Sequence, residues 1–372
     1  MANAATPATE THTATSTAAQ AGTTQPARQS APKATTFASA LNTAMSDAME
    51  HDADVCVFGE DVGTLGGVFR ITDGLTQRFG ENRCFDTPLA ESGIAGMATG
   101  MAINGMRPVI EMQFDAFAYP ALEQVFSHIA KVANRTRGHV RLPMVIRIPY
   151  GGGVGGVEHH CDSSEAYYAH TPGLKVYTPA TVADAYLMLR EAIDSPDPVV
   201  FFEPKKLYWT KEPVDLSALR SSYESSADGS DSPAGVGAQG RAIVAREGTD
   251  VSLISYGPSV ATALKAAEAA AEEGISAEVL DLRSIVPFDD AALTATVEKT
   301  GRAVVVAEAQ GFVSVAGEIV ARIQERCFHS LASPVRRVTG FDIPYPSPKL
   351  EEHHLPSVDR ILDTLDELQW ED

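Results

Sequence analysis

The chain has 372 residues and a strong acidic excess: 29 lysine and arginine residues stand against 49 aspartate and glutamate residues, so the formal net charge is −20 at pH 7. This charge excludes nucleic acid or an anionic membrane as the main partner, because both would be repelled. No apolar run approaches the ~20 residues that a membrane-spanning helix needs, so we expect a soluble protein. At about 150 residues per domain, the length suggests two domains.

Residues 1–34 consist mainly of Ala, Thr, Gln, Ser and Pro, with almost no large apolar side chains. Such a segment cannot bury enough surface to offset the entropy of ordering it, so we expect a disordered leader. The leader lacks the apolar core of a secretory signal, and Arg28 alone is too little basic charge for a mitochondrial transit peptide. We therefore expect a bacterial cytoplasmic protein rather than one of the mitochondrial matrix.

The cysteines are spread widely and form no Cys-x-x-Cys pair, which excludes a zinc ribbon and a disulfide scaffold and fits a reducing compartment. They are Cys56, Cys84, Cys161 and Cys327.

The first domain is expected over residues 35–203, where apolar strands alternate with amphipathic helices. This alternation is typical of a parallel sheet covered on both faces. Small residues such as Gly96 and Gly100 crowd the helix that follows Glu91, which suits close packing against another backbone. The expected strands are 55–58, 109–114, 144–148, 174–177 and 199–202, and the expected helices are 37–48, 73–79, 118–136 and 182–193.

A second α/β series follows a change in composition. Residues 204–235 are rich in Pro, Ser and Gly, so they are expected to form an exposed linker. The second domain is then expected over residues 236–372, and the fold class is α/β with two α/β domains. The expected strands of the second domain are 251–256, 277–282, 303–307 and 335–338, and its expected helices are 260–272, 290–299, 315–327 and 358–368.

A glycine loop over residues 151–156 matches the pattern Gly-x-Gly-x-x-Gly after an expected strand. A dinucleotide fingerprint also needs a helix directly after the loop and an acidic residue at the end of the next strand. Both are missing, because the next strand ends in Thr178-Pro179. The loop therefore favours close backbone approach to another ligand or a tight connection, although a nicotinamide-dependent oxidoreductase stays as an alternative.

Two acidic positions stand at the ends of elements. Glu60 and Asp61 follow the strand over 55–58, at the sheet edge where open α/β sheets bind ligands. Glu91 precedes the small-residue helix, where the helix dipole alone would stabilise it. The pattern leaves open whether these acids act chemically or lie in a solvated turn.

Three histidines lie near the glycine loop, His159, His160 and His170, with Cys161 and Asp162 beside them. Adjacent side chains in an extended segment point in opposite directions, so at most one of the neighbouring pair faces a given site. A metal site would need ligands on one face. A single histidine that delivers a proton suits the position better.

Several motifs, in order from about residue 36 to the end of the chain, resemble one family. They are Val57-Phe58-Gly59-Glu60-Asp61-Val62, Gly66-Gly67-Val68-Phe69-Arg70, Asp86-Thr87-Pro88-Leu89-Ala90-Glu91, Glu111-Met112-Gln113-Phe114, Glu165-Ala166-Tyr167-Tyr168-Ala169-His170, Phe202-Glu203-Pro204-Lys205, Asp281-Leu282-Arg283-Ser284 and Gly340-Phe341-Asp342-Ile343-Pro344-Tyr345-Pro346. The family is the β subunit of the E1 component of 2-oxo acid dehydrogenase complexes.

The resemblance implies a pyrimidine-binding domain of the thiamin-diphosphate-binding fold, followed by a transketolase C-terminal-like domain. It also implies an α subunit partner in an α2β2 heterotetramer, with thiamin diphosphate between the two subunits. Thiamin enzymes hold the diphosphate and Mg²⁺ through a Gly-Asp-Gly motif, which this chain lacks. The α subunit is therefore expected to hold Mg²⁺, and this chain is expected to be inactive alone.

By the same resemblance, Glu91 hydrogen-bonds N1′ of the aminopyrimidine, and Leu89, Gln113 and Phe117 lie along the cofactor. Glu60 is expected to join buried acids or contact the cofactor. His160 matches the histidine assigned to acyl transfer to the lipoyl group of E2, with His159 as the alternative.

The resemblance further implies a potassium ion held by backbone carbonyls with side-chain help. The positions concerned are Met144, Ala192, Ile193, Ser195 and Asp197.

The residues 111–117 and 201–205 resemble the branched-chain subclass more than the pyruvate subclass, so branched-chain 2-oxo acids are the favoured substrates. The second domain is expected to supply the docking face for the lipoyl-bearing E2 acyltransferase. An assembly subunit with vestigial cleft residues, acting in no reaction, is the other alternative.

Overall fold

The computed structural model describes residues 1–3, 34–226 and 241–369, and the described residues from 34 onward form one unit. The expected leader falls almost wholly outside the described residues, as do residues 227–235 of the expected linker. Among the described residues, no helix has the length and apolar character needed to cross a membrane.

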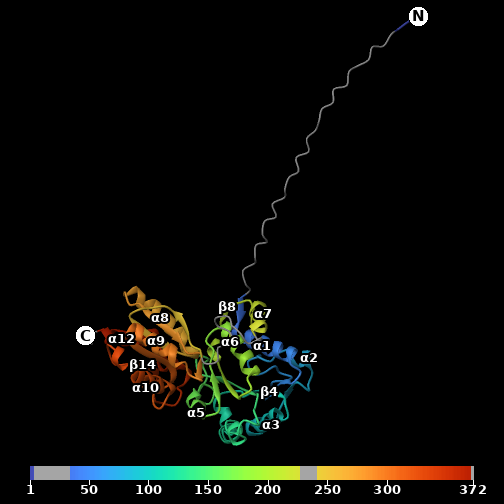
Figure 1. Ribbon diagram of the computed structural model, residues 1–372, viewed down its shortest axis with the longest axis horizontal. Helices are drawn as coiled ribbons and strands as arrows, with labels where there is room; N and C mark the ends of the chain where they lie inside the picture. The colour runs from blue at the N-terminus through green and yellow to red at the C-terminus, as the bar shows by residue number, and fades with distance from the viewer. Residues whose placement is uncertain (4–33, 227–240, 370–372) are drawn as a thin grey trace. The chain divides into compact units, whose positions relative to one another are not determined.

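A seven-stranded sheet carries the first half of the unit (Figure 1). Its strand order is β12-β6-β7-β5-β4-β2-β3, and every neighbouring pair is parallel except β12 with β6. The strands are β2 (Val55–Gly59), β3 (Cys84–Asp86), β4 (Arg107–Glu111), β5 (Val145–Tyr150), β6 (Lys175–Tyr177), β7 (Val199–Pro204) and β12 (Ser284–Val286).

Alternation along the strands divides the core between the two faces of this sheet. Val55 and Val57 pack with α1 and α6 on one face, whereas Cys56 and Phe58 pack with α3 on the other. The Thr36 hydroxyl accepts a hydrogen bond from the amide of Ser39 and so caps α1. The helices are α1 (Phe37–His51), α2 (Leu75–Phe79), α3 (Glu91–Ile103), α4 (Val132–Arg135), α5 (Glu165–Ala169) and α6 (Val182–Asp194).

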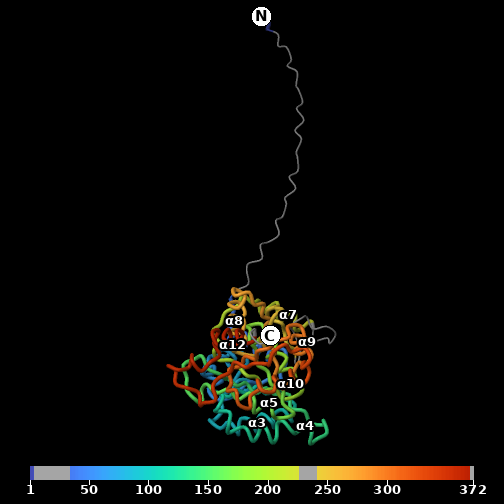
Figure 2. Tube along the Cα trace, turned by 90° about the vertical axis from the view of Figure 1, so that its left-hand side faces the viewer, coloured from blue at the N-terminus to red at the C-terminus, as the bar shows by residue number. Residues whose placement is uncertain are grey.

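The second domain contains a five-stranded sheet with the order β14-β13-β10-β11-β9. Helices α8 and α12 lie side by side on one face (Figure 1 and Figure 2), and α9 and α10 cover the other. The strands are β9 (Ile243–Arg246), β10 (Val251–Ser255), β11 (Ala277–Asp281), β13 (Ala303–Gln310) and β14 (Arg336–Gly340). The helices are α8 (Val260–Glu272), α9 (Asp290–Thr300), α10 (Val315–Cys327), α11 (Glu351–His354) and α12 (Val358–Gln369).

The single helix expected over 118–136 is wrong. The structure has a 3₁₀ helix at Ala116–Ala121, a π-helix at Gln124–Ile129 and the short helix α4. Pro120 lacks an amide hydrogen and crowds the preceding turn, which accounts for the first break. The wider hydrogen bonding of the π segment then prevents a continuous α-helix.

The linker expected from residue 204 is also wrong up to residue 226. Strand β8 (Lys211–Pro213) pairs antiparallel with β1 (Ala34–Thr36), and α7 (Leu216–Ser226) follows. On α7, the Tyr223 hydroxyl donates to Asp194 of α6 at 2.6 Å. These residues therefore belong to the first domain, although their composition resembles that of a linker.

Strand β12 links the two domains, because it belongs to the second half of the sequence but pairs with β6 of the first sheet. Beside it, Arg283 forms a buried ion pair with Asp184. The Tyr256 hydroxyl donates to Glu165 at 2.9 Å across the same boundary. The two domains thus share a polar and apolar interface.

Arg147, which is 0% exposed, ties together three central strands. Its guanidinium donates to Glu111 of β4 at 2.7 Å and to both carboxylate oxygens of Glu203 of β7, at 2.6 and 2.9 Å. The Tyr208 hydroxyl also donates to Glu203, at 2.8 Å. A bidentate pair of this kind fixes the orientation of the two side chains relative to each other.

Replacing Arg147 by Met should destabilise the chain by about 3–5 kcal/mol, because two buried carboxylates would lose their cation. Urea unfolding of the purified chain measures the effect. The control is Arg141→Met, whose exposed pair with Asp197 should be worth about 0–1 kcal/mol. Equal losses in both variants would contradict the role given to Arg147.

Candidate functional site

The carboxyl ends of β2 and β4 bring together three of the expected site residues. Glu60 and Asp61 follow β2, and Gln113 follows β4. The Gln113 amide donates to the Asp61 carboxylate at 2.9 Å. The two strands pair in parallel, so their carboxyl ends lie at the same edge of the sheet.

Glu60 is buried, with 3% of its surface exposed, and its Oε1 has no hydrogen-bond partner within the described part of the chain. Burial raises the pKa of this carboxyl to about 7, and the charges of Glu91 and Asp61 add to the rise. Three acids therefore lie within electrostatic reach of one another. Because the pKa of Glu60 is about 7, its carboxyl can take up or release a proton near neutral pH.

Glu91 is the first residue of α3 and is half-buried, as expected for an acid at a helix N-terminus. The amide of Thr87 donates to the Gly59 carbonyl at 2.9 Å, which brings the segment before α3 alongside Glu60. The Thr87 hydroxyl is buried and, like Glu60 Oε1, unpartnered among the described residues. Leu89 of the same segment is 79% exposed. This edge therefore combines unpaired polar atoms with an exposed apolar side chain.

An aromatic cluster borders the acids. The ring centroid of His160 lies 4.6 Å from that of Phe114 and 5.2 Å from that of Phe117, both in edge-to-face contact. Phe69 packs on Phe114 at 5.5 Å. His160 is half-buried in this cluster, whereas His159 is exposed and has a φ of 72°. The geometry thus favours His160 over His159 as the histidine of the site.

The other members of the expected histidine cluster do not join it. His170 lines a different cavity, and Cys161 is buried, which raises the pKa of its thiol to about 11. In the part of the chain that the structure describes, no three His, Cys, Asp or Glu side chains are placed to hold a metal ion.

The glycine loop binds carboxylates of the second domain. The amides of Gly153 and Gly155 donate to Glu351 at 2.8 and 3.2 Å, and the amide of Gly152 donates to Glu308. A Cβ at Gly152 would lie 1.6 Å from the Tyr345 hydroxyl, so only glycine fits. The amides that would grip a diphosphate are therefore engaged within the chain, which argues against the dinucleotide alternative.

Comparison with known proteins decides the family. The transketolase pyrimidine binding domain matches residues 33–210, and the transketolase C-terminal domain matches residues 240–361. A pyruvate dehydrogenase E1 component subunit beta from Leifsonia xyli subsp. xyli is 49% identical over 327 residues, covering 88% of this chain and 92% of the relative. A 3-methyl-2-oxobutanoate dehydrogenase subunit beta from Mycobacterium tuberculosis is 48% identical over 332 residues, covering 89% and 91%.

The chain belongs to the family of 2-oxo acid dehydrogenase E1 beta subunits. The expected family and the expected fold class of two α/β domains are both confirmed. A solved structure described as "Split gene transketolase, inactive beta4 tetramer" has the same fold, with a TM-score of 0.69 at 21% identity, and covers 90% of this chain and 99% of that one.

The potassium site expected for an E1 beta subunit is not supported by the geometry. The Arg107 guanidinium donates to the carbonyls of Ile193 and Ser195, at 3.0 and 3.4 Å. The Lys175 ammonium donates to the Ser195 hydroxyl at 2.9 Å, and Arg141 pairs with Asp197. The Met144 carbonyl accepts from the amide of Val199. Because cationic side chains already occupy this turn, its residues do not fit a potassium ion.

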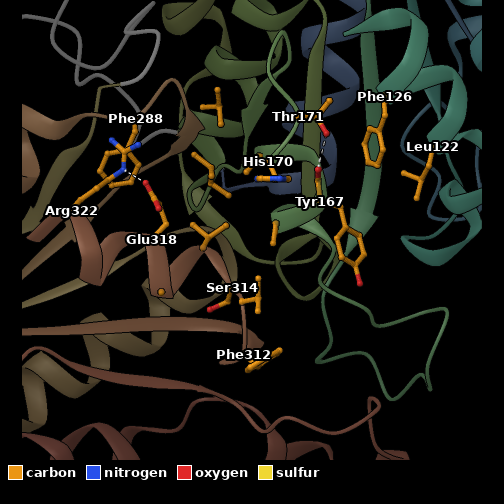
Figure 3. A pocket seen from close by; sticks show the side chains of 17 residues that line it. Leu122, Phe126, Tyr167, His170, Thr171, Phe288, Phe312, Ser314, Glu318 and Arg322 are labelled. Carbon is orange, nitrogen blue, oxygen red and sulfur yellow. Dashed lines mark hydrogen bonds and ion pairs between the residues drawn. The ribbon is translucent and has the colours of Figure 1, made fainter. Parts of the chain in front are cut away.

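A separate cavity of about 1060 Å³ lies between elements of the two domains (Figure 3). Leu122, Phe126 and Tyr167 face it from one side, and Phe312 faces it from the other. Glu60, Glu91, Phe114, Phe117 and His160 do not line it. This cavity is therefore distinct from the candidate site.

Glu60→Gln should make the chain more stable at pH 8, by roughly 1–3 kcal/mol. Burial raises the carboxyl pKa from 4.5 to about 7, so the folded chain holds more protons than the unfolded chain between those values, and stability falls as pH rises through them. Unfolding measured from pH 4 to pH 8 should show a flatter profile for the variant. Glu123→Gln, at an exposed position, is the control. If stability depended on pH in Glu60→Gln as it does in the wild type, the raised pKa of Glu60 would be refuted.

Proposed function

We propose that this E1 beta subunit acts on branched-chain 2-oxo acids, in an α2β2 heterotetramer with an α subunit, and holds the pyrimidine end of thiamin diphosphate. The observation that carries the proposal is the edge formed by Glu60, Glu91 and Gln113 beside an aromatic cluster. The two relatives described above are bacterial, and we place the reaction in the bacterial cytoplasm.

The residues of this edge fit an aminopyrimidine. Glu60 Oε1 and the Thr87 hydroxyl are buried polar atoms that still need partners within the described residues. Thiamin diphosphate, when bound, would supply an electron sink for the loss of carbon dioxide from a 2-oxo acid. Glu91 would hydrogen-bond N1′ and share its proton, with Glu60 as the neighbouring acid. Leu89, Gln113 and Phe117 would lie along the cofactor.

The charged end of the cofactor is assigned to the α subunit, which would also hold Mg²⁺. The glycine-loop amides are engaged by Glu308 and Glu351, and the chain has no Gly-Asp-Gly motif. Leu89 and Met97, at 79% and 41% exposure, offer apolar surface to a partner beside the acids. A related fold that is described as inactive in a β4 assembly agrees with a subunit that holds half of a site.

The acyl group would pass to the lipoyl group of E2. His160 is held beside the acids by Phe114 and Phe117, where an imidazole can donate a proton to the departing sulfur. The second domain is proposed as the docking face for E2.

Pyruvate is the alternative substrate, because one relative is named a pyruvate dehydrogenase subunit and the other a 3-methyl-2-oxobutanoate dehydrogenase subunit. Extra methylene groups change binding in a pocket by about 1–3 kcal/mol each. Co-expression with the α-type chain, followed by turnover measurements with 3-methyl-2-oxobutanoate and pyruvate, tests the choice. Thiamin diphosphate binding by this chain alone, with keto acid turnover, would overturn the shared site.

In the reconstituted complex, Glu91→Gln should lower decarboxylation at least about 100-fold, because an amide cannot share the N1′ proton. The exposed Glu81→Gln should leave the rate unchanged. Decarboxylation followed with an artificial oxidant gives the measurement. An unchanged rate in Glu91→Gln would support the vestigial alternative.

His160→Ala should leave decarboxylation with the artificial oxidant within about twofold and slow acyl transfer to lipoyl-E2 by about 100-fold. The exposed neighbour His159→Ala is the matched control and should change neither rate. If both assays fall equally in His160→Ala, the histidine does not act in transfer.

A further inference from the structure

Lys205 is a buried cation that the proposed chemistry does not use. It follows β7, is 1% exposed, and its Nζ has no hydrogen-bond partner among the residues that the structure describes. A buried ammonium that lacks hydrogen bonds is costly and needs compensation from nearby charge.

Among the charged groups near Lys205, Asp115 has the largest electrostatic effect on it, and Asp115 is 0% exposed. Burial raises the pKa of Asp115 and lowers that of Lys205, and each group opposes the other's shift. Around Lys205 lie Cys161, Glu308 and Asp162, while Glu165 and the hydrogen bonds from Ser164 act on Asp115. The two buried groups thus interact electrostatically, and each favours the charged form of the other.

Asp115 also fastens the segment that carries His160. Its carboxylate accepts hydrogen bonds from both the amide of Ser164, at 2.9 Å, and the Ser164 hydroxyl. The amide of Ala116 donates to the His159 carbonyl at 3.3 Å. These hydrogen bonds therefore hold the chain on both sides of His160, at His159 and at Ser164.

A third tether completes the arrangement, because the Tyr119 hydroxyl donates to the Asp162 carboxylate at 3.1 Å. Phe114 and Phe117 stand on either side of Asp115 along the chain, and they are the two rings that contact His160. The segment that presents the aromatic surface and the segment that presents the histidine are thus joined through the carboxylates of Asp115 and Asp162 and through one backbone hydrogen bond.

We propose that Asp115 and Lys205 are positioning residues that hold residues 157–164, and with them His160, against Phe114 and Phe117. An ionised carboxylate has both oxygens free to accept the two hydrogen bonds from Ser164. The Lys205 charge lowers the pKa of Asp115 and so favours that form, against the effect of burial. The effect on acyl transfer rests on the proposed function, whereas the effect on the segment does not.

Hydrogen–deuterium exchange of the intact complex tests the positioning directly. Lys205→Met should speed amide exchange over residues 157–164 by about tenfold, because the segment opens more often. Lys206→Met removes the adjacent exposed charge and should leave the segment unchanged. Asp115→Asn leaves one acceptor oxygen in place of two, so it should likewise speed exchange over residues 157–164.

Ser164→Ala provides a milder test if Lys205→Met does not assemble. It removes one hydrogen bond to Asp115 and keeps the charge pair, so it should also speed exchange over residues 157–164. Unchanged exchange in every assembled variant, or equal loss of protection in the Lys206→Met control, would overturn the proposal.

Activity provides the second measurement. Lys205→Met should slow acyl transfer to lipoyl-E2 by between about 10- and 100-fold and spare decarboxylation with an artificial oxidant. Because loss of Lys205 raises the pKa of Asp115, the acidic limb of the transfer profile should move to higher pH. A wild-type complex without keto acid turnover would refute the proposed function, while the exchange data would still decide the positioning.

Discussion

The ion pairs of Arg147 are the constraint on which the candidate site depends. They join β4, β5 and β7, and three segments near the site leave the sheet beyond the carboxyl ends of these strands. The aromatic segment follows Glu111, the glycine loop follows Tyr150, and Lys205 follows Glu203. Because a bidentate guanidinium permits little sliding of its partners, the relative positions of these segments are set within the buried sheet rather than in the loops.

Much of this arrangement could be predicted from the sequence because it depends on local periodicity. The apolar run at 55–58 predicts a buried strand, and a parallel sheet then places Glu60 at a ligand-binding edge. The small residues after Glu91 predict a helix, which forms as α3, but Gly96 and Gly100 meet no other backbone among the described residues. In each case the decisive interactions lie within a few residues along the chain, or follow from the general geometry of α/β sheets.

The remainder depends on contacts between distant parts of the chain. Glu308 and Glu351 occupy the amides of the glycine loop, although they lie more than a hundred residues away in sequence. Helix α7 has the composition of a linker and becomes ordered through α6. Strand β12 has three residues and pairs with the sheet of the other domain. No local pattern distinguishes these outcomes, because tertiary packing overrides weak propensity.

The electrostatics of the site explain why one subunit would hold only one end of the cofactor. Glu60, Asp61 and Glu91 are gathered at one edge, and the described residues compensate Glu111 with Arg147 deeper in the sheet. A diphosphate placed against three acids would be repelled, whereas the ring nitrogens and amino group of a pyrimidine would find acceptors. The chain's overall charge of −20 acts in the same direction. In the proposed heterotetramer, another subunit would therefore neutralise the phosphates.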